Sequence, residues 1–118
     1  MRLEGQIFGA SVLVLIDSGA THNFISPTVV EALGLSLTHS TPLSVRLGDG
    51  HRIMTSGYCD NIVLHVGDMI FTIQAHVLGI GDVDLILGVV WLETLGKVTM
   101  DWHEMSMAFE YGGKSVTL

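Results

Sequence analysis

The sequence predicts a single, mostly β domain with one or two short helices. The chain has 118 residues, which is a usual length for one domain. Hydrophobic residues make up 48% of it, enough to build a core at this size. Its 14 glycines and two prolines separate short apolar runs about every ten residues, which is the spacing of strands and turns in an all-β domain.

The first predicted elements are a hairpin and a helix. Strands at 6–8 and 12–16 lie on either side of a predicted turn at residues 9–10. The second strand is apolar throughout, so we expect both of its faces to be buried. Ser26-Pro27 is typical of a helix cap and first turn, and Gly34 marks the end of that helix.

Two further hairpins are predicted in the middle of the chain. Segments 44–47 and 51–55 flank Gly48–Gly50, a strong signal for a tight turn. The clearest alternation of apolar and polar residues is found in 62–77, with a turn at Gly67-Asp68.

The last third of the chain is predicted to combine one helix with short strands. Residues 84–88 form a short buried strand, and residues 89–95 form a helix that ends at Gly96 and contributes Trp91 to the core. The closing strands are predicted at 98–100, 105–111 and 115–118.

The composition argues against nucleic-acid and membrane partners. Five basic and 12 acidic residues give a net charge of −7, whereas binding to phosphates needs clustered Lys and Arg. The sequence has neither the pattern of a secretory signal nor a membrane-spanning apolar run. The single cysteine, Cys59, cannot form an intramolecular disulfide, which fits a reducing compartment. We therefore expect a cytoplasmic domain. Because both ends lie in strand-like sequence, we also expect it to belong to a longer polypeptide.

Common patterns for cofactors and metals are missing from the sequence. It has no phosphate-binding or dinucleotide-binding glycine motif, and no two of its six histidines have the spacing of a local metal site. We therefore expect neither a cofactor nor a metal.

The string Ile16–Thr21 stands out, because it places Asp17 directly after an apolar strand and before a hydroxyl residue and a glycine. An ordinary turn explains such a tripeptide in many loops. Acid–base hydrolysis of a peptide bond, in contrast, needs two carboxyl groups in opposite protonation states. The sequence has only one Asp-Ser-Gly loop. If Asp17 is catalytic, its partner must be Asp17 of a second copy, related by a two-fold axis.

Two segments, Val14–Ser26 and Asp84–Leu92, resemble the retropepsin-like aspartic proteases. The greatest similarity is to the protease domain of plant gypsy-type LTR retrotransposon polyproteins. The resemblance covers nearly the whole chain, residues 1–118. It implies a small, closed, barrel-like β fold and a homodimeric endopeptidase that processes a polyprotein substrate without a cofactor.

The resemblance also implies a site. Residues 48–50 take the position of the flap that closes over substrate, and Leu85–Gly88 packs beneath the catalytic loop. The implied catalytic residues are Asp17, Ser18, whose hydroxyl bonds across the dimer axis, and Gly19. The implied substrate-binding residues are Ala20, Thr21, Gly48, Asp49 and Gly50.

The chain departs from the family pattern after Ala20, where many retropepsins have an acidic residue and this sequence has Thr21 and His22. His22 lies either within reach of the cleft or in solvent. The departure leaves a second interpretation open, namely a catalytically weak or inactive domain that dimerises or binds peptides. A cellular retropepsin-like domain of the ubiquitin-shuttle kind is a third.

Overall fold

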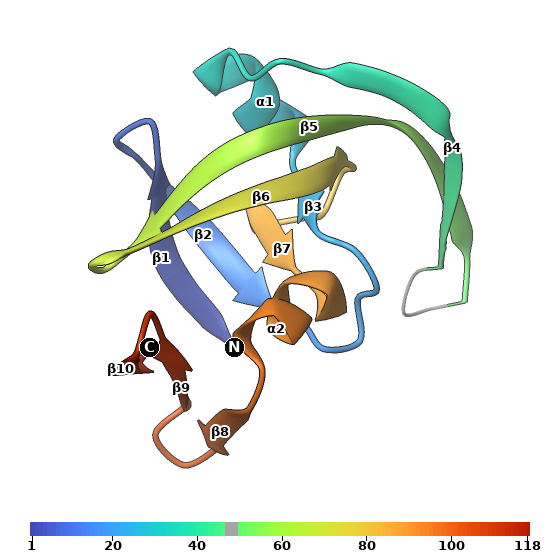
Figure 1. Ribbon diagram of the computed structural model, residues 1–118. Helices are drawn as coiled ribbons and strands as arrows, with labels where there is room; N and C mark the ends of the chain where they lie inside the picture. The colour runs from blue at the N-terminus through green and yellow to red at the C-terminus, as the bar shows by residue number, and fades with distance from the viewer. Residues whose placement is uncertain (47–49) are drawn as a thin grey trace.

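The computed structural model of the chain describes residues 1–46 and 50–118, apart from the side chain of Ser56. The predicted mostly β fold is confirmed, with two short helices in the described residues (Figure 1). In chain order the elements are β1 (Arg2–Ile7), β2 (Ala10–Ile16), β3 (Phe24–Ile25), α1 (Pro27–Leu33), β4 (Thr38–Arg46), β5 (Arg52–Val66), β6 (Met69–Val77), β7 (Leu85–Leu87), α2 (Val89–Leu95), β8 (Val98–Asp101), β9 (Ser106–Tyr111) and β10 (Lys114–Thr117).

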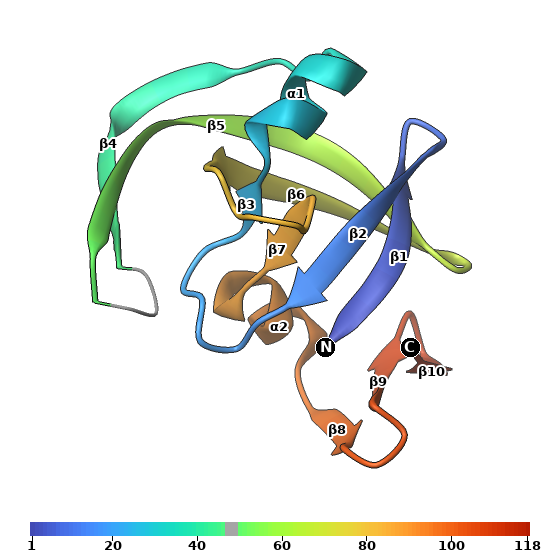
Figure 2. The ribbon, with the colours of Figure 1, turned by 180° about the vertical axis from the view of Figure 1, so that it is seen from behind.

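Six of these strands form a closed barrel, as the resemblance implies. The hydrogen-bonded order is β1-β2-β7-β3-β6-β5, and β1 pairs again with β5 to close the ring. The closure depends on Gly5, because a Cβ there would lie 2.9 Å from the Leu64 side chain and 3.1 Å from the His65 carbonyl oxygen. Seen from behind, the β1–β2 hairpin and β7 form the near wall of the barrel (Figure 2).

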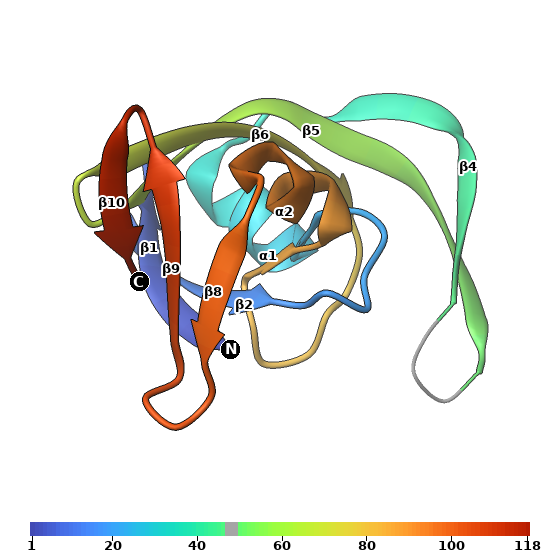
Figure 3. The ribbon, with the colours of Figure 1, turned by 60° about the horizontal axis from the view of Figure 1, so that its bottom comes forward.

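A second, three-stranded sheet, β10-β9-β8, lies below the barrel in Figure 1 and beside α2 in Figure 3. Its strand β9 contributes Met107 and Phe109 to the same buried cluster as Leu64 and Trp91. On β6, Met69, Phe71, Ile73 and Ala75 are buried while the residues between them are exposed. This confirms the alternation predicted for 62–77, because alternate residues of a strand face opposite sides of the sheet.

The first hairpin differs from the prediction in two respects. Its turn lies at Phe8 and Gly9 instead of residues 9–10, since Ile7 pairs with Ala10. Both turn residues have positive φ, 51° and 76°, as the favoured two-residue hairpin turn requires. In addition, β2 is buried on one face only: Val12 is buried and Leu13 is not fully buried, because a strand in a barrel wall has one interior face.

Both predicted helices are confirmed, with the expected ends. Ser26 caps α1, its Oγ accepting a hydrogen bond from the Thr28 amide at 3.2 Å, and Gly34 ends the helix in a left-handed conformation, φ 64°. Gly88 precedes α2 and Gly96, at φ 71°, follows it. Within the described residues, neither helix is long and apolar enough to cross a membrane.

The β4–β5 hairpin is longer than predicted and arches away from the barrel (Figures 1 and 2). In all three ribbon views, the described end of the β4–β5 hairpin lies on the same side of the molecule as the segment that joins β2 to β3.

Candidate active site

Asp17 lies at the end of β2 in a loop fixed by backbone hydrogen bonds. Its amide donates to the Leu87 carbonyl at 3.0 Å, which continues the parallel pairing of β2 with β7. The Ala20 amide donates to the Asp17 carbonyl at 3.1 Å, and the Gly19 amide donates to Asp17 Oδ1 at 2.8 Å. The carboxyl group is therefore oriented by its own loop, on a residue that is only partly buried.

The backbone of Gly88 packs closely against this loop. A Cβ at Gly88 would lie 2.5 Å from the Ala20 carbonyl oxygen and nearer still to that of His22. The next residue, Val89, donates its amide to the Ala20 carbonyl at 2.8 Å. Any side chain at position 88 would push the loop away from α2, so the packing expected for Leu85–Gly88 is found here.

A buried amide, Asn23, connects the loop to two other elements. Its Oδ1 accepts from the Gly88 amide at 3.0 Å and its Nδ2 donates to the Gln74 carbonyl at 3.1 Å. Its own carbonyl accepts from the His76 amide at 2.9 Å. Asn23 thus fixes the loop against both α2 and β6. The sequence analysis missed it, although an amide directly before the apolar pair of β3 is a signal that could have been noted.

His22 is half-buried and packs against His76. The two rings are T-shaped with centroids 5.3 Å apart, and Thr21 Oγ1 lies 2.9 Å from His22 Nδ1. Burial lowers the pKa of His76 below its usual range, and the nearby His22 lowers it further. His22 is thus half-buried and contacts His76, so it is not fully solvated. His76 was not singled out from the sequence.

The predicted site residues divide into two groups. Asp17 to Thr21 share one loop, in which Ser18, Gly19 and Thr21 are exposed. Gly50 is exposed at the end of the β4–β5 hairpin, with φ 91°. Gly48 and Asp49 lie outside the described residues. Within residues 1–46 and 50–118, no three His, Cys, Asp or Glu side chains are grouped in a way that could hold a metal ion.

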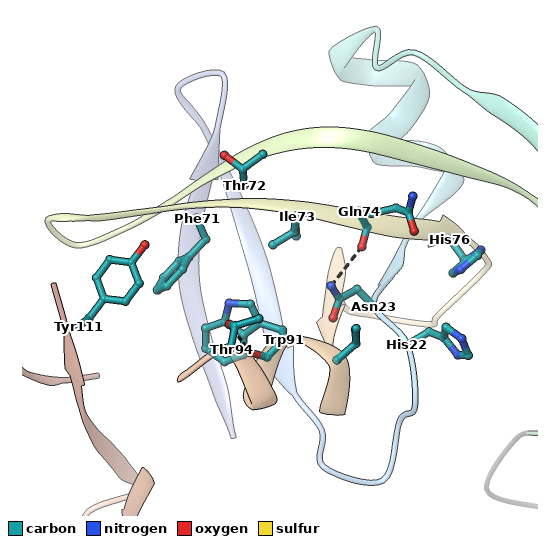
Figure 4. A pocket seen from close by; sticks show the side chains of 11 residues that line it. His22, Asn23, Phe71, Thr72, Ile73, Gln74, His76, Trp91, Thr94 and Tyr111 are labelled. Atoms are coloured by element: carbon teal, nitrogen blue, oxygen red, sulfur yellow. Dashed lines mark hydrogen bonds between the residues drawn. The ribbon is translucent and has the colours of Figure 1, made fainter. Parts of the chain in front are cut away.

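A pocket of about 380 Å³ lies next to the loop, between β6 and α2 (Figure 4). His22 and Asn23 line one end of it and Tyr111 lines the other, whereas Asp17 does not line it. Trp91 is the core residue that the sequence predicts, only 3% exposed, and it also forms a wall of this pocket. Its Nε1 has no hydrogen-bond partner in the described part of the chain.

Comparison with known proteins gives a family and a fold. The family model described as retroviral aspartyl protease matches residues 4–114. Among solved structures, the retroviral protease-like domain of Ddi1 from Leishmania major is similar with a TM-score of 0.69 and 18% identity, over 93% of this chain and 87% of that one. A retropepsin-like aspartic protease from Rickettsia conorii is similar with a TM-score of 0.65 and 18% identity, over 99% of this chain and 84% of that one. No curated protein matches the chain significantly.

Proposed function

Because the chain belongs to the retroviral aspartyl protease family, we propose that it is an aspartic endopeptidase that acts as a homodimer. The observation that carries this proposal is the position of Asp17. Its carboxyl group is partly exposed at the end of β2, and its loop is held by Leu87 and Gly88. A loop supported in this way keeps a reacting carboxyl in one orientation, which acid–base catalysis requires.

The homodimer follows from the chemistry of hydrolysis. The sequence supplies one Asp-Ser-Gly loop, while the reaction needs both a carboxylate and a carboxylic acid. A two-fold axis beside the loop places a second Asp17 opposite the first. Two carboxyl groups within about 3 Å of each other share one proton, because both cannot be ionised at that separation.

In the proposed mechanism, a water molecule lies between the two Asp17 side chains. The ionised carboxylate accepts a proton from this water as its oxygen bonds to the peptide carbonyl carbon. The other Asp17 donates its proton to the carbonyl oxygen, which forms a neutral gem-diol. When the C–N bond breaks, the Asp17 that took the proton from water donates it to the leaving nitrogen, and a gem-diol hydroxyl returns a proton to the other Asp17. The products are a carboxyl and an amino terminus.

The remaining site residues are assigned to substrate binding and to the dimer axis. Ser18 bonds across the axis to its partner loop, and Gly19 allows close approach to the scissile bond. The exposed positions of both residues support these roles. The residues assigned to the substrate backbone are Ala20, Thr21, Gly48, Asp49 and Gly50.

We further propose that the substrate is a polyprotein and that the domain is of the plant gypsy type. The support is the sequence similarity of Val14–Ser26 and Asp84–Leu92 to those retrotransposon proteases.

The β4–β5 hairpin is proposed to carry the flap. Its described end lies on the same side of the molecule as the Asp17 loop, as a flap requires (Figure 1).

The test compares the wild-type protein with Asp17→Asn. Both are incubated with denatured casein from pH 4 to 7, with and without a statine-type inhibitor. Asp17→Asn should remain folded and dimeric while its cleavage rate falls by about 10³-fold or more. Asp68→Asn is the matched control, because this exposed acid lies in the turn between β5 and β6, and it should cleave at the wild-type rate.

Two outcomes contradict the proposal. Cleavage that persists in Asp17→Asn would show that another group carries the activity. A wild-type dimer without inhibitor-sensitive cleavage would instead support the peptide-binding or dimerisation domain left open above.

A further inference from the structure

Strand β6 has an edge that the rest of the chain leaves only partly paired. On one side β6 pairs with β5 along its length, but on the other side β3 covers only His76 and Val77. The reason is that β3 has two residues. Beyond it, the edge of β6 from Ile70 to Gln74 has no neighbouring strand among the described residues.

The register shows which backbone groups this edge presents. Val66 and Met69 flank a two-residue turn, so they form a hydrogen-bonded pair. Hydrogen-bonded and non-hydrogen-bonded pairs alternate along an antiparallel ladder. The amide and carbonyl groups of Ile70, Thr72 and Gln74 therefore point away from β5. The His76 amide, two residues further on, follows the same alternation, since it donates to the Asn23 carbonyl.

Side chains satisfy the two ends of this edge and leave its middle open. Tyr111 donates its hydroxyl to the Ile70 carbonyl at 3.1 Å, and Asn23 donates to the Gln74 carbonyl at 3.1 Å. Between them, the Thr72 amide and carbonyl and the Gln74 amide have no partner within the described residues. Such a row of donor and acceptor groups is a template for an added strand.

The pocket beside this edge has room for such a strand. It lies between β6 and α2, where a longer β3 would run, with Asn23 at one end and Tyr111 at the other (Figure 4). Ile70 to Gln74 spans about 13 Å, which is the length of a few extended residues. Phe71 and Trp91 give the pocket apolar walls, and no Lys, Arg, Asp or Glu is among the described residues that line it. It therefore suits a neutral segment with apolar side chains.

We propose that the edge of β6 at Thr72 and Gln74 is an additional binding site for the polypeptide substrate, which joins the sheet there as an extended strand. This inference rests on the proposed function. The occupant is the substrate itself because the pocket begins at His22, one residue beyond the proposed substrate-binding residue Thr21. A segment that leaves the Asp17 loop along this side therefore meets the open edge of β6.

The first experiment measures hydrogen exchange of backbone amides by NMR in Asp17→Asn protein saturated with dephosphorylated, denatured casein. Casein should slow exchange of the Thr72 and Gln74 amides by at least tenfold relative to the free protein. Asp68 is an exposed residue in the turn between β5 and β6. Its amide is the internal control, and its exchange should not change. Unchanged exchange at Thr72 and Gln74 would overturn the inference, whether or not the wild-type protein cleaves casein.

The second experiment uses the wild-type background and a pair of substitutions. Thr72→Pro removes the outward amide without breaking a bond to β5, since proline is tolerated at such an edge position. Thr72→Ala keeps the amide and serves as its control. Thr72→Pro should lower kcat/KM on casein by at least fivefold and leave kcat/KM on an eight-residue casein peptide unchanged. Thr72→Ala should change neither value.

The outcomes separate the two proposals. Equal kcat/KM for both variants on casein would overturn the inference while the protease assignment stands. Amide protection by casein in a protein that cleaves nothing would support the β6 site and contradict the protease assignment. If Thr72→Pro does not fold, the hydrogen-exchange experiment alone decides whether the substrate binds at the edge of β6.

Discussion

At the level of single residues, Gly88 determines how closely the Asp17 loop approaches α2. Neither a turn nor a positive φ accounts for this glycine: its φ is −97°. The reason for it is steric, because the carbonyl oxygens of Ala20 and His22 occupy the place of a side chain. Overfilling a packed site forces backbone movement, and here the backbone that must move is that of the proposed catalytic loop.

We therefore expect Gly88→Ala to destabilise the protein by about 3 kcal/mol and to lower its proteolytic activity as the loop shifts. Urea unfolding and casein cleavage measure the two effects. Gly79→Ala is the control, because a Cβ at this exposed glycine would meet nothing within 4 Å. Equal stability of the two variants would show that the contact at Gly88 is easily relieved.

His76 should make stability depend on pH. Burial, and then the charge of His22, lower its pKa in the folded state from the ordinary value of 6.5. The unfolded chain therefore binds the proton more readily. The stabilising contribution of neutral His76 is present above pH 6.5 and is lost as the pH falls through the lowered pKa.

His76→Gln should accordingly lose less stability than the wild type when the pH is lowered from 7 to 5, as measured by urea unfolding. His39→Gln, which replaces an exposed histidine of β4, should keep the wild-type pH dependence. His22→Gln should reduce the dependence in part, because it removes the second cause of the shift. Identical profiles for His76→Gln and the wild type would contradict this account.

The same residues show what sequence reasoning can reach in the site. Asp17 to Thr21 are consecutive, so one motif identifies them together. Asn23 and His76 are different, because their contacts join positions about fifty residues apart, and no local pattern encodes such a distance. The role of Trp91 in the core was predictable from its helix, whereas the pocket beside it depends on how short β3 is.

At the level of elements, the helices were predicted well because their ends are marked by single residues. Ser26 and Gly34 bound α1, and Gly96 follows α2. The strands were predicted less well where a residue adopts a backbone conformation that is unusual for its type. Phe8 has positive φ, which is uncommon for an aromatic residue. The bulge at Asn61 lets β5 continue through positions that periodicity alone would treat as separate strands.

The cap of α1 gives a prediction at this level. Ser26→Ala removes the acceptor for the Thr28 amide and should lower the free energy of unfolding by about 1 kcal/mol. Ser36→Ala, at an exposed position after the helix, should change it by less than about 0.5 kcal/mol. Urea unfolding at neutral pH measures both, and a neutral Ser26→Ala would mean that water replaces the cap.

At the level of the whole molecule, the proposed homodimer predicts that inactive copies interfere with active ones. If each active dimer needs two Asp17 side chains, a mixed dimer with one Asp17→Asn chain is inactive. A threefold excess of Asp17→Asn protein, allowed to exchange subunits, should therefore reduce wild-type activity to about one quarter by random pairing. An equal excess of Asp68→Asn protein should not inhibit. Undiminished activity with Asp17→Asn would mean that one chain is sufficient.

The closure of the barrel at β1 and β5 has a consequence for the order in which the molecule opens. In the described part of the chain, Gln6 and Ile7 are the only β1 residues that pair with β5 across this seam, whereas β2 pairs with β7 independently. Local opening at the seam can therefore free part of β1 without disturbing the support of Asp17. In native-state exchange, the seam amides of β1 should lose protection before the Asp17 amide does. The barrel can therefore open locally between β1 and β5 while the Asp17 carboxyl group stays in position.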